Sequence, residues 1–247
     1  MEATDFYEKV SAFINEKRAE AVRSEIELFQ NRRLEKLRKN HTLKRPYAEG
    51  PKLVIHLIPE SAFLNSRPFD IGALAGRPEA IRPLGSKSHD QTFSFDGLLH
   101  YCDGPERRCW SYVQVFNNGI IEAVSSRQFG VSEEGKKGIY TGYLEPDIIE
   151  AVREYLPLQK KLGVNSVVLM FLSLLGVLDY KLFAGVRSDA FDKIHAIDET
   201  DLLFPAFVFV GETVTPEELK PTFDRLWNAA GYPRSYSYDE KGSWITR

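Results

Sequence analysis

Residues 52–63 read Lys-Leu-Val-Ile-His-Leu-Ile-Pro-Glu-Ser-Ala-Phe and form the most informative stretch of this 247-residue chain. The run from 52 to 58 is almost entirely apolar, and Pro59 follows it directly. A short apolar run that is closed by proline predicts a buried strand that ends in a turn. His56 lies in the middle of this strand, and a lone histidine there is typical of a hydrogen-bonded core residue rather than a metal ligand.

The composition limits the class of protein. Hydrophobic residues make up 43% of the chain and charged residues 27%, as in ordinary soluble globular proteins. The longest apolar run, Val167 to Leu178, falls well short of the roughly 20 residues that span a bilayer. The chain opens with acidic residues rather than the basic start of a signal peptide. We therefore expect a cytoplasmic protein without membrane contact, in which Cys102 and Cys109 are reduced thiols.

The first 45 residues predict a charged helical arm, separated by the linker Pro46–Pro51 from a globular domain at 46–247. Residues 4–40 contain neither glycine nor proline, so they predict one long helix or two helices end to end. Two apolar stripes at helical spacing flank the almost wholly polar or charged residues 15–20. The first stripe is Phe6, Val10, Phe13 and Ile14, and the second begins with Ile26, Phe29, Leu34 and Leu37. A stripe broken in this way indicates an arm that projects or packs on a partner protein or a second copy.

The end of the arm carries a cluster of positive charge with Glu35 as the single acid between 31 and 45. The cations are Arg32, Arg33, Lys36, Arg38, Lys39, Lys44 and Arg45. Clustered cations of this kind suit nucleic-acid backbone, because each neutralised phosphate releases counterions. They equally suit an acidic partner, or a solvated helix end whose cations interact with the helix dipole.

The globular domain predicts an α+β fold with a mostly antiparallel sheet and two or more packed helices. Asn118-Gly119 joins two apolar runs and is a strong hairpin signal, whereas 130–139 is expected to be an exposed loop. A helix is predicted from near Glu145 to Gly163. The run 164–175 fits either a buried strand or a core helix. The last helix is the best specified, because Thr215-Pro216-Glu217-Glu218 is a capping box with proline at the first helical position.

The C-terminal segment is rich in aromatic residues and arginine. Tyr232, Arg234 and Tyr236 are candidate contacts for a partner, because aromatic and arginine side chains anchor protein interfaces. The alternative is that this segment packs on its own domain.

Three passages carry a resemblance to a known family: residues 52–63, the hairpin 112–123 and the tail 221–244. Together they resemble the C-terminal region of bacterial proteins that begin with an Alba-like, Schlafen-type DNA-binding domain. In that family the region follows a linker helix rich in Arg and Glu, which residues 1–40 resemble. The Alba-like domain itself is absent from these 247 residues. The resemblance therefore implies an association with a DNA-linked or phage-defence system, and no catalytic residue can be transferred from it.

One group of residues invites a catalytic interpretation: His89, Asp90, Asp96, His100 and Asp103. Histidines and carboxylates that converge can hold a metal ion or act as acid and base. Gly97 interrupts this segment and argues against a regular arrangement. The sequence has neither a Gly-x-Ser-x-Gly elbow nor a Walker-type phosphate loop, and we expect no cofactor or metal.

These observations favour a non-enzymatic protein-interaction module. The first alternative is a nucleic-acid-binding accessory domain that uses the cations at 32–45. The second is a metal-dependent hydrolase or nuclease built on the histidine and aspartate group.

Overall fold

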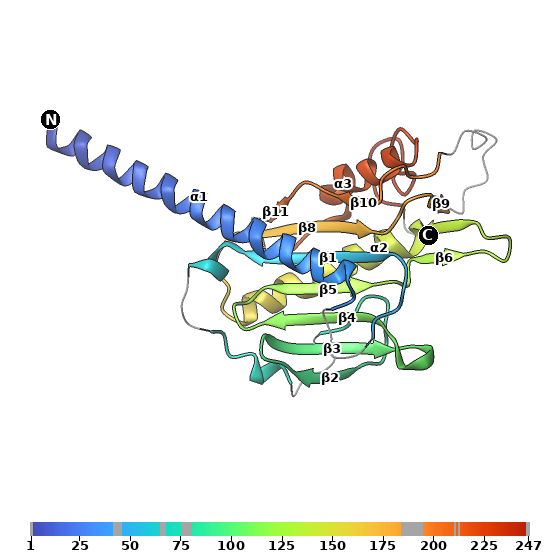
Figure 1. Ribbon diagram of the computed structural model, residues 1–247. Coiled ribbons are helices and arrows are strands. Elements are labelled where there is room, and N and C mark those ends of the chain that lie inside the picture. The colour runs from blue at the N-terminus through green and yellow to red at the C-terminus, as the bar shows by residue number, and fades with distance from the viewer. Residues whose placement is uncertain are drawn as a thin grey trace.

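The computed structural model describes residues 2–41, 46–64, 68–75, 81–183, 195–209, 211 and 213–245, with the backbone alone for 2–14 and Pro105. The fold is α+β, as predicted, with helices on both faces of a mostly antiparallel sheet (Figure 1). The α-helices are α1 (Glu2–Arg38), α2 (Thr141–Lys161) and α3 (Pro216–Ala229). Short 3-10 turns are η1 (Glu60–Phe63), η2 (Gly72–Leu74) and η4 (Pro105–Arg107).

The large sheet has the strand order β10-β8-β1-β5-β4-β3-β2, and β11 also pairs with β8. Every pairing in it is antiparallel. Its strands are β1 (Lys52–Pro59), β2 (Asp90–Phe93), β3 (Gly97–Asp103), β4 (Cys109–Phe116), β5 (Ile121–Ser125), β8 (Val168–Leu175), β10 (Asp201–Leu203) and β11 (Phe207–Phe209). A small second sheet contains β6 (Phe129–Val131), β7 (Lys137–Tyr140) and β9 (Lys181–Phe183).

Strand β1 is buried along its whole length, as its sequence predicts. It pairs with β5 on one side and with β8 on the other, and both faces are covered. Leu53, Ile55 and Leu57 pack in the core that includes α2, whereas Val54 packs with residues of α1 on the opposite face. The same pairing confirms the strand interpretation of the apolar run at 164–175.

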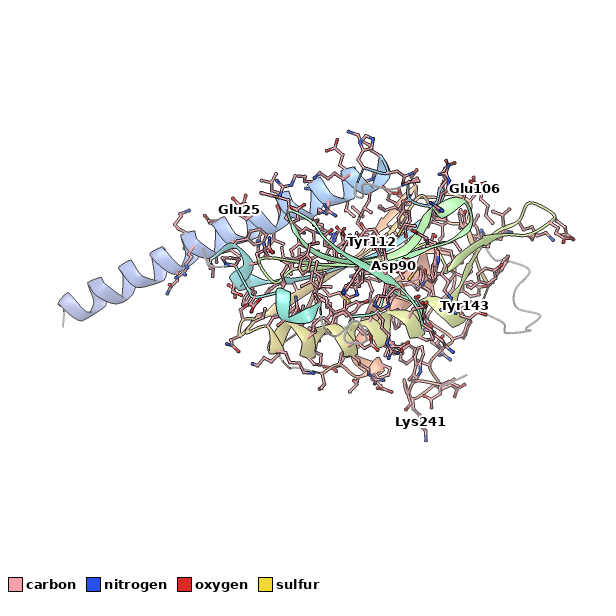
Figure 2. All side chains as sticks on the ribbon, turned by 90° about the horizontal axis from the view of Figure 1, so that it is seen from below. Glu25, Asp90, Glu106, Tyr112, Tyr143 and Lys241 are labelled. Atoms are coloured by element: carbon pink, nitrogen blue, oxygen red, sulfur yellow. The ribbon has the colours of Figure 1, made fainter. Side chains whose placement is uncertain are left out.

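The three helices occupy different places on the sheet. The C-terminal half of α1 crosses one face, while α2 lies on the other (Figure 1). Helix α3 packs beside α2, where the indole Nε1 of Trp227 donates a hydrogen bond to Glu145 at 2.8 Å. The N-terminal half of α1 runs past the sheet and away from the body in both views (Figures 1 and 2). Its C-terminal half thus belongs to the packed body, although the sequence placed it in a separate arm.

Several predicted elements differ from the structure. Residues 130–139 are not a simple loop, because β6 and β7 form a hairpin there. Strand β7 pairs in parallel with β9, which lies far along the chain and leaves no local signal. Helix α2 begins at Thr141 rather than near Glu145, because burial of Leu144 extends it by a turn.

Other local predictions are confirmed. The Thr215 hydroxyl accepts from the Glu218 backbone N–H, and the Glu218 side chain accepts from the Thr215 N–H, which completes the capping box. Cys102 and Cys109 are free and buried. Burial, with a smaller contribution from Asp103, raises the pKa of Cys109 to about 12, so its thiol is unreactive near neutral pH. None of the helices in the described ranges combines the length and apolarity that a membrane span needs.

Candidate functional site

The site begins with the way α1 packs on the sheet. The predicted second stripe is confirmed, because Ile26, Phe29, Leu34 and Leu37 are all buried against strands. Phe29 makes edge-to-face contact with Phe116 of β4 at a ring distance of 5.4 Å. This packing fixes the axis of α1 across β1, β5 and β4.

A buried polar network lies beneath the helix, centred on the Glu122 carboxylate of β5. Arg33 donates to it from Nε at 2.8 Å and from Nη2 at 2.5 Å. Tyr112 donates its hydroxyl at 2.7 Å, and His56 Nε2 lies 2.8 Å from the other oxygen. His56 is thus a hydrogen-bonded core residue, as predicted. Three residues therefore satisfy one carboxylate with four hydrogen bonds away from water, which is the condition for keeping it charged there.

The charges of Arg33 and Glu122 stabilise each other. Burial alone would raise the pKa of Glu122, but the Arg33 charge and the hydrogen bonds from Arg33 and His56 outweigh it and hold that pKa well below its ordinary value. Burial likewise opposes the charge of Arg33, and the Glu122 carboxylate outweighs it and raises the pKa of the guanidinium. Both groups are therefore ionised at neutral pH.

Arg33 is almost fully buried, but it also borders a surface pocket. Its guanidinium carbon lies 5.2 Å from the centre of the Phe116 ring. Nη1 has no hydrogen-bond partner within the described parts of the chain, since Glu122 takes only Nε and Nη2. Arg33 lines a surface pocket of about 510 Å³, which we call the α1 groove. The residues that line it are Phe29, Arg32, Arg33, Lys36, Phe63, Phe95, Asp96, Phe116, Asn117 and Asn118.

The far wall of the groove is the turn between β2 and β3. Asn117 fixes this turn, because its Nδ2 donates to the Phe95 carbonyl at 3.1 Å and its N–H donates to the Asp96 carbonyl at 2.9 Å. Gly97 follows with φ +152°, and a Cβ there would lie 2.0 Å from the Val115 carbonyl oxygen. The turn is therefore held by backbone contacts, and it presents Phe95 to solvent with 98% of that residue exposed.

The cations of the predicted basic segment lie in different environments. Arg32 and Lys36 are exposed and line the groove. Arg38 pairs with Asp201 at 2.7 Å, and Lys39 pairs with Glu35. Lys44 and Arg45 lie outside the described residues. Arg33 differs from these neighbours, because it is only 4% exposed and its charge is paired with the Glu122 carboxylate. Its predicted contact with nucleic acid or an acidic partner stays a prediction.

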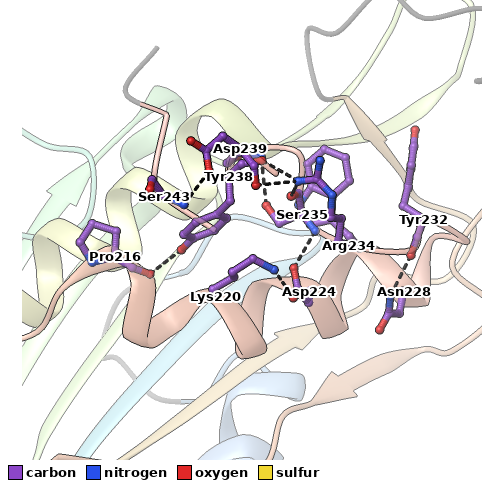
Figure 3. A network of polar contacts seen from close by, with 12 residues as sticks. Pro216, Lys220, Asp224, Asn228, Tyr232, Arg234, Ser235, Tyr238, Asp239 and Ser243 are labelled. Carbon is purple, nitrogen blue, oxygen red and sulfur yellow. Dashed lines mark hydrogen bonds and ion pairs between the residues drawn. The ribbon is translucent and has the colours of Figure 1, made fainter. Parts of the chain in front are cut away.

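The aromatic tail packs on its own domain in the described structure. Tyr232 is buried against Trp227 at a ring distance of 5.0 Å. Arg234 lies over the Tyr236 ring and donates Nη1 to the Tyr238 carbonyl at 2.6 Å (Figure 3). These contacts hold the tail on α3, as the alternative of a self-packed segment expects. Arg234 and Tyr236 remain partly exposed, and the partner contacts of Tyr232, Arg234 and Tyr236 stay a prediction.

The first apolar stripe lies in the projecting half of α1. For Phe6, Val10, Phe13 and Ile14 the structure describes the backbone helix, and their side chains lie outside the described part. Residues 15–21, which follow the stripe, are all exposed.

The predicted catalytic group separates in the fold. His89 and His100 do meet, with ring centres 4.9 Å apart. Asp96 and Asp103 lie at opposite ends of β3, and Asp96 lines the α1 groove instead. Across the described ranges, no three His, Cys, Asp or Glu side chains are grouped so that they could hold a metal ion. Burial, and then the neighbouring His89, lower the pKa of His100 to about 4, so it is neutral at physiological pH.

Comparison with known proteins found no match for this chain. No family model matches the chain, and no match was found among curated proteins or among solved structures.

The sequence interpretation missed Glu122, Phe95 and the Asn117 and Asn118 side chains as parts of this site. Glu122 did carry a signal, because it is a single acid inside the apolar run 120–124. An acid in a buried strand requires a partner. That partner, Arg33, is 89 positions away and could not be chosen from the sequence.

Proposed function

We propose that this chain is a non-enzymatic interaction module that presents the N-terminal part of α1 to another protein. The observation that carries the proposal is the exposure of every residue from 15 to 21. Seven consecutive exposed residues make about two helical turns. This part of α1 consequently has no buried face at all.

A helix without a buried face lacks the packing that stabilises most helices in proteins, so its presence needs an explanation. Most helical stability in proteins comes from packing an apolar face, and isolated helices shorter than about 12–15 residues are marginal in water. A helix that is polar all round typically bridges solvent between packed bodies. The ion pair from Lys17 to Glu20, at 2.8 Å, supports such a solvated spacer. The spacer sets the stripe at Phe6, Val10, Phe13 and Ile14 apart from the body.

The opposite end of α1 is firmly anchored. Arg33 is tied to Glu122, and Phe29 packs among Phe63 and Phe116. A rigid anchor gives the projecting half a defined direction, which lowers the entropy lost when a partner binds. An amphipathic helix that lays its apolar face in a groove is a common mode of protein recognition. The stripe has the spacing that this mode uses.

We also propose the cellular system and the compartment in which this interaction takes place. The resemblance to the C-terminal region of Alba-like, Schlafen-type bacterial proteins supports a DNA-linked or phage-defence system. Two buried free thiols, Cys102 and Cys109, support a reducing compartment such as the cytoplasm.

The proposal is tested by changing the stripe and leaving the anchor intact. The double variant Val10→Asp, Phe13→Asp is compared with the wild type and with Arg23→Glu, an exposed change on the same helix. Light scattering over a range of concentrations measures self-association, and a tagged full chain captures other proteins for reciprocal confirmation. We expect the stripe variant to lose the complex and Arg23→Glu to keep it. If the stripe variant keeps the same mass and the same confirmed partner, the proposal is wrong.

A further inference from the structure

The α1 groove is a second, separate site with its own chemistry. It lies between the C-terminal half of α1 and the turn that carries Phe95, on the packed body rather than on the projecting helix. Its volume of about 510 Å³ lies within the range of about 300–1,000 Å³ that is usual for small-ligand pockets.

Positive charge lines one wall of the groove. Arg32 and Lys36 are four residues apart on α1, which places them on the same face of the helix. Neither has an ion-pair partner among the residues that the structure describes, unlike Arg38 and Lys39 nearby. Arg33 adds its unused Nη1 from below, with its orientation fixed by Glu122. This wall is suited to an anion.

An exposed aromatic ring forms the other wall. Burying a phenylalanine side chain stabilises a fold, so leaving one in water forgoes that stabilisation. Phe95 is nonetheless almost fully exposed, and the contacts of Asn117 and Gly97 hold its turn in place. A ring that a fixed turn presents to solvent offers an accessible stacking surface.

Polar groups between the two walls include both donors and acceptors. The Oδ1 of Asn118 accepts a hydrogen bond from the Ile120 N–H at 3.4 Å, and the Nδ2 of Asn117 donates one to the Phe95 carbonyl. Among the described residues, no hydrogen-bond partner is found for the amide Nδ2 of Asn118, the Oδ1 of Asn117 or the Asp96 carboxylate, so these groups remain for a ligand. Asp96 is the one acidic side chain among the residues that line the groove.

We propose that the α1 groove binds a segment of single-stranded nucleic acid, with backbone phosphates at Arg32 and Lys36 and an unpaired base stacked on Phe95. A base carries amino or imino donors for Asp96, as cytosine N4 does for carboxylates in other complexes. The charged side chains of an acidic peptide cannot donate to Asp96, because ionised carboxylates only accept hydrogen bonds. A duplex would keep its bases stacked within the helix and could not use Phe95.

The test is fluorescence anisotropy of the full chain with labelled single-stranded DNA, single-stranded RNA and a DNA duplex. Oligonucleotides of about 12 nucleotides match the site sizes of single-strand-binding modules. Salt is varied from about 50 to about 200 mM, a range in which phosphate contacts weaken strongly. The two cations that contact phosphates, Arg32 and Lys36, predict a slope of log affinity against log salt of about −1.4 for single strands. We expect single strands to bind more tightly than the duplex, and the DNA and RNA arms identify the preferred sugar.

Substitutions inside and outside the α1 groove test whether the nucleic acid binds there. Phe95→Ala is expected to weaken binding roughly 10- to 100-fold, as loss of one stacked base predicts. Arg32→Glu with Lys36→Glu is expected to weaken it further and to flatten the salt slope by roughly 1.4. Phe93→Ala and Arg23→Glu are matched controls, because both residues are exposed and lie outside the groove. These two controls are expected to leave the affinity unchanged.

All these side chains are exposed, so circular dichroism and thermal melting should show that the variants fold. The absence of single-strand binding at low salt overturns the proposal. So does binding that falls equally in the Arg23→Glu control, since it would then come from the general charge of the helix. An acidic, tyrosine-containing peptide serves as a competitor. If that peptide alone binds and depends on Arg32 and Lys36, the groove is a protein site and the proposal is wrong. None of these outcomes bears on the stripe at 6–14.

Discussion

Arg33 on α1 and Glu122 on β5 form a two-point ion pair, with side chains that are only 5% and 0% exposed. The pair is one of the links between the sheet and α1, the helix that carries the apolar stripe and one wall of the α1 groove. Removing one member of a buried pair leaves the other charge without compensation, which is far more costly than losing an exposed pair. The anchor can therefore be tested directly.

The first prediction concerns the strength of this anchor. Glu122→Gln should lower the free energy of unfolding by about 3–5 kcal/mol, because Arg33 would remain buried without a countercharge. Urea unfolding followed by circular dichroism measures the change. Glu35→Gln is the control, because Glu35 pairs with Lys39 at an exposed position, where such pairs contribute little to stability. Equal effects of the two substitutions would show that the buried pair is not an anchor.

The second prediction concerns the loss of stability at low pH. The pKa of Glu122 is held below its ordinary value in the folded state, so its contribution to stability is complete above that value and is lost as the pH falls beneath it. The ordinary value is 4.5. The wild type should therefore lose stability between neutral pH and strong acid more steeply than Glu122→Gln. Unfolding free energies at a series of pH values below 4.5 measure the difference, and parallel curves would contradict it.

The third prediction concerns Glu145, a buried carboxylate with the opposite behaviour. Burial raises its pKa, although hydrogen bonds from Trp227 and Ser235 partly oppose this shift. Its favourable contribution is therefore complete below the ordinary value and is lost as the pH rises through the raised pKa. Glu145→Gln keeps the acceptor for Trp227 and should change the neutral-pH stability by less than about 1 kcal/mol. Urea unfolding compares it with Glu122→Gln, and a loss as large as in that variant would contradict the assignment.

The fourth prediction concerns the turn that presents Phe95. Gly97→Ala should cost about 3 kcal/mol or more, because it combines a positive φ with a Cβ placed 2.0 Å from the Val115 carbonyl. Gly135→Ala also has a positive φ but meets open space, so it should cost only about 1 kcal/mol. Thermal and urea unfolding of the pair separates the clash from the backbone effect. Similar losses would mean that the close approach at Gly97 is relieved without cost.

Much of the fold could be predicted from sequence because its signals are local. The apolar run closed by Pro59 predicted β1, Asn118-Gly119 predicted the hairpin, and the Thr215 capping box predicted the start of α3. Each of these depends on residues within one element or one turn. The hairpin of β6 and β7 was missed because its stabilising neighbour, β9, lies far away in the chain.

The candidate site was predicted only in part. The sequence by itself determined that the end of α1 is basic, because charge is a property of the residues themselves. Only the tertiary structure decided that Arg33 turns inward to Glu122 while Arg32 and Lys36 are exposed at the α1 groove. It also decided that Phe95 faces them and that the aromatic tail does not. The physical reason is that burial and pairing arise between residues far apart in the chain, and these decide which charges and rings remain exposed to a ligand.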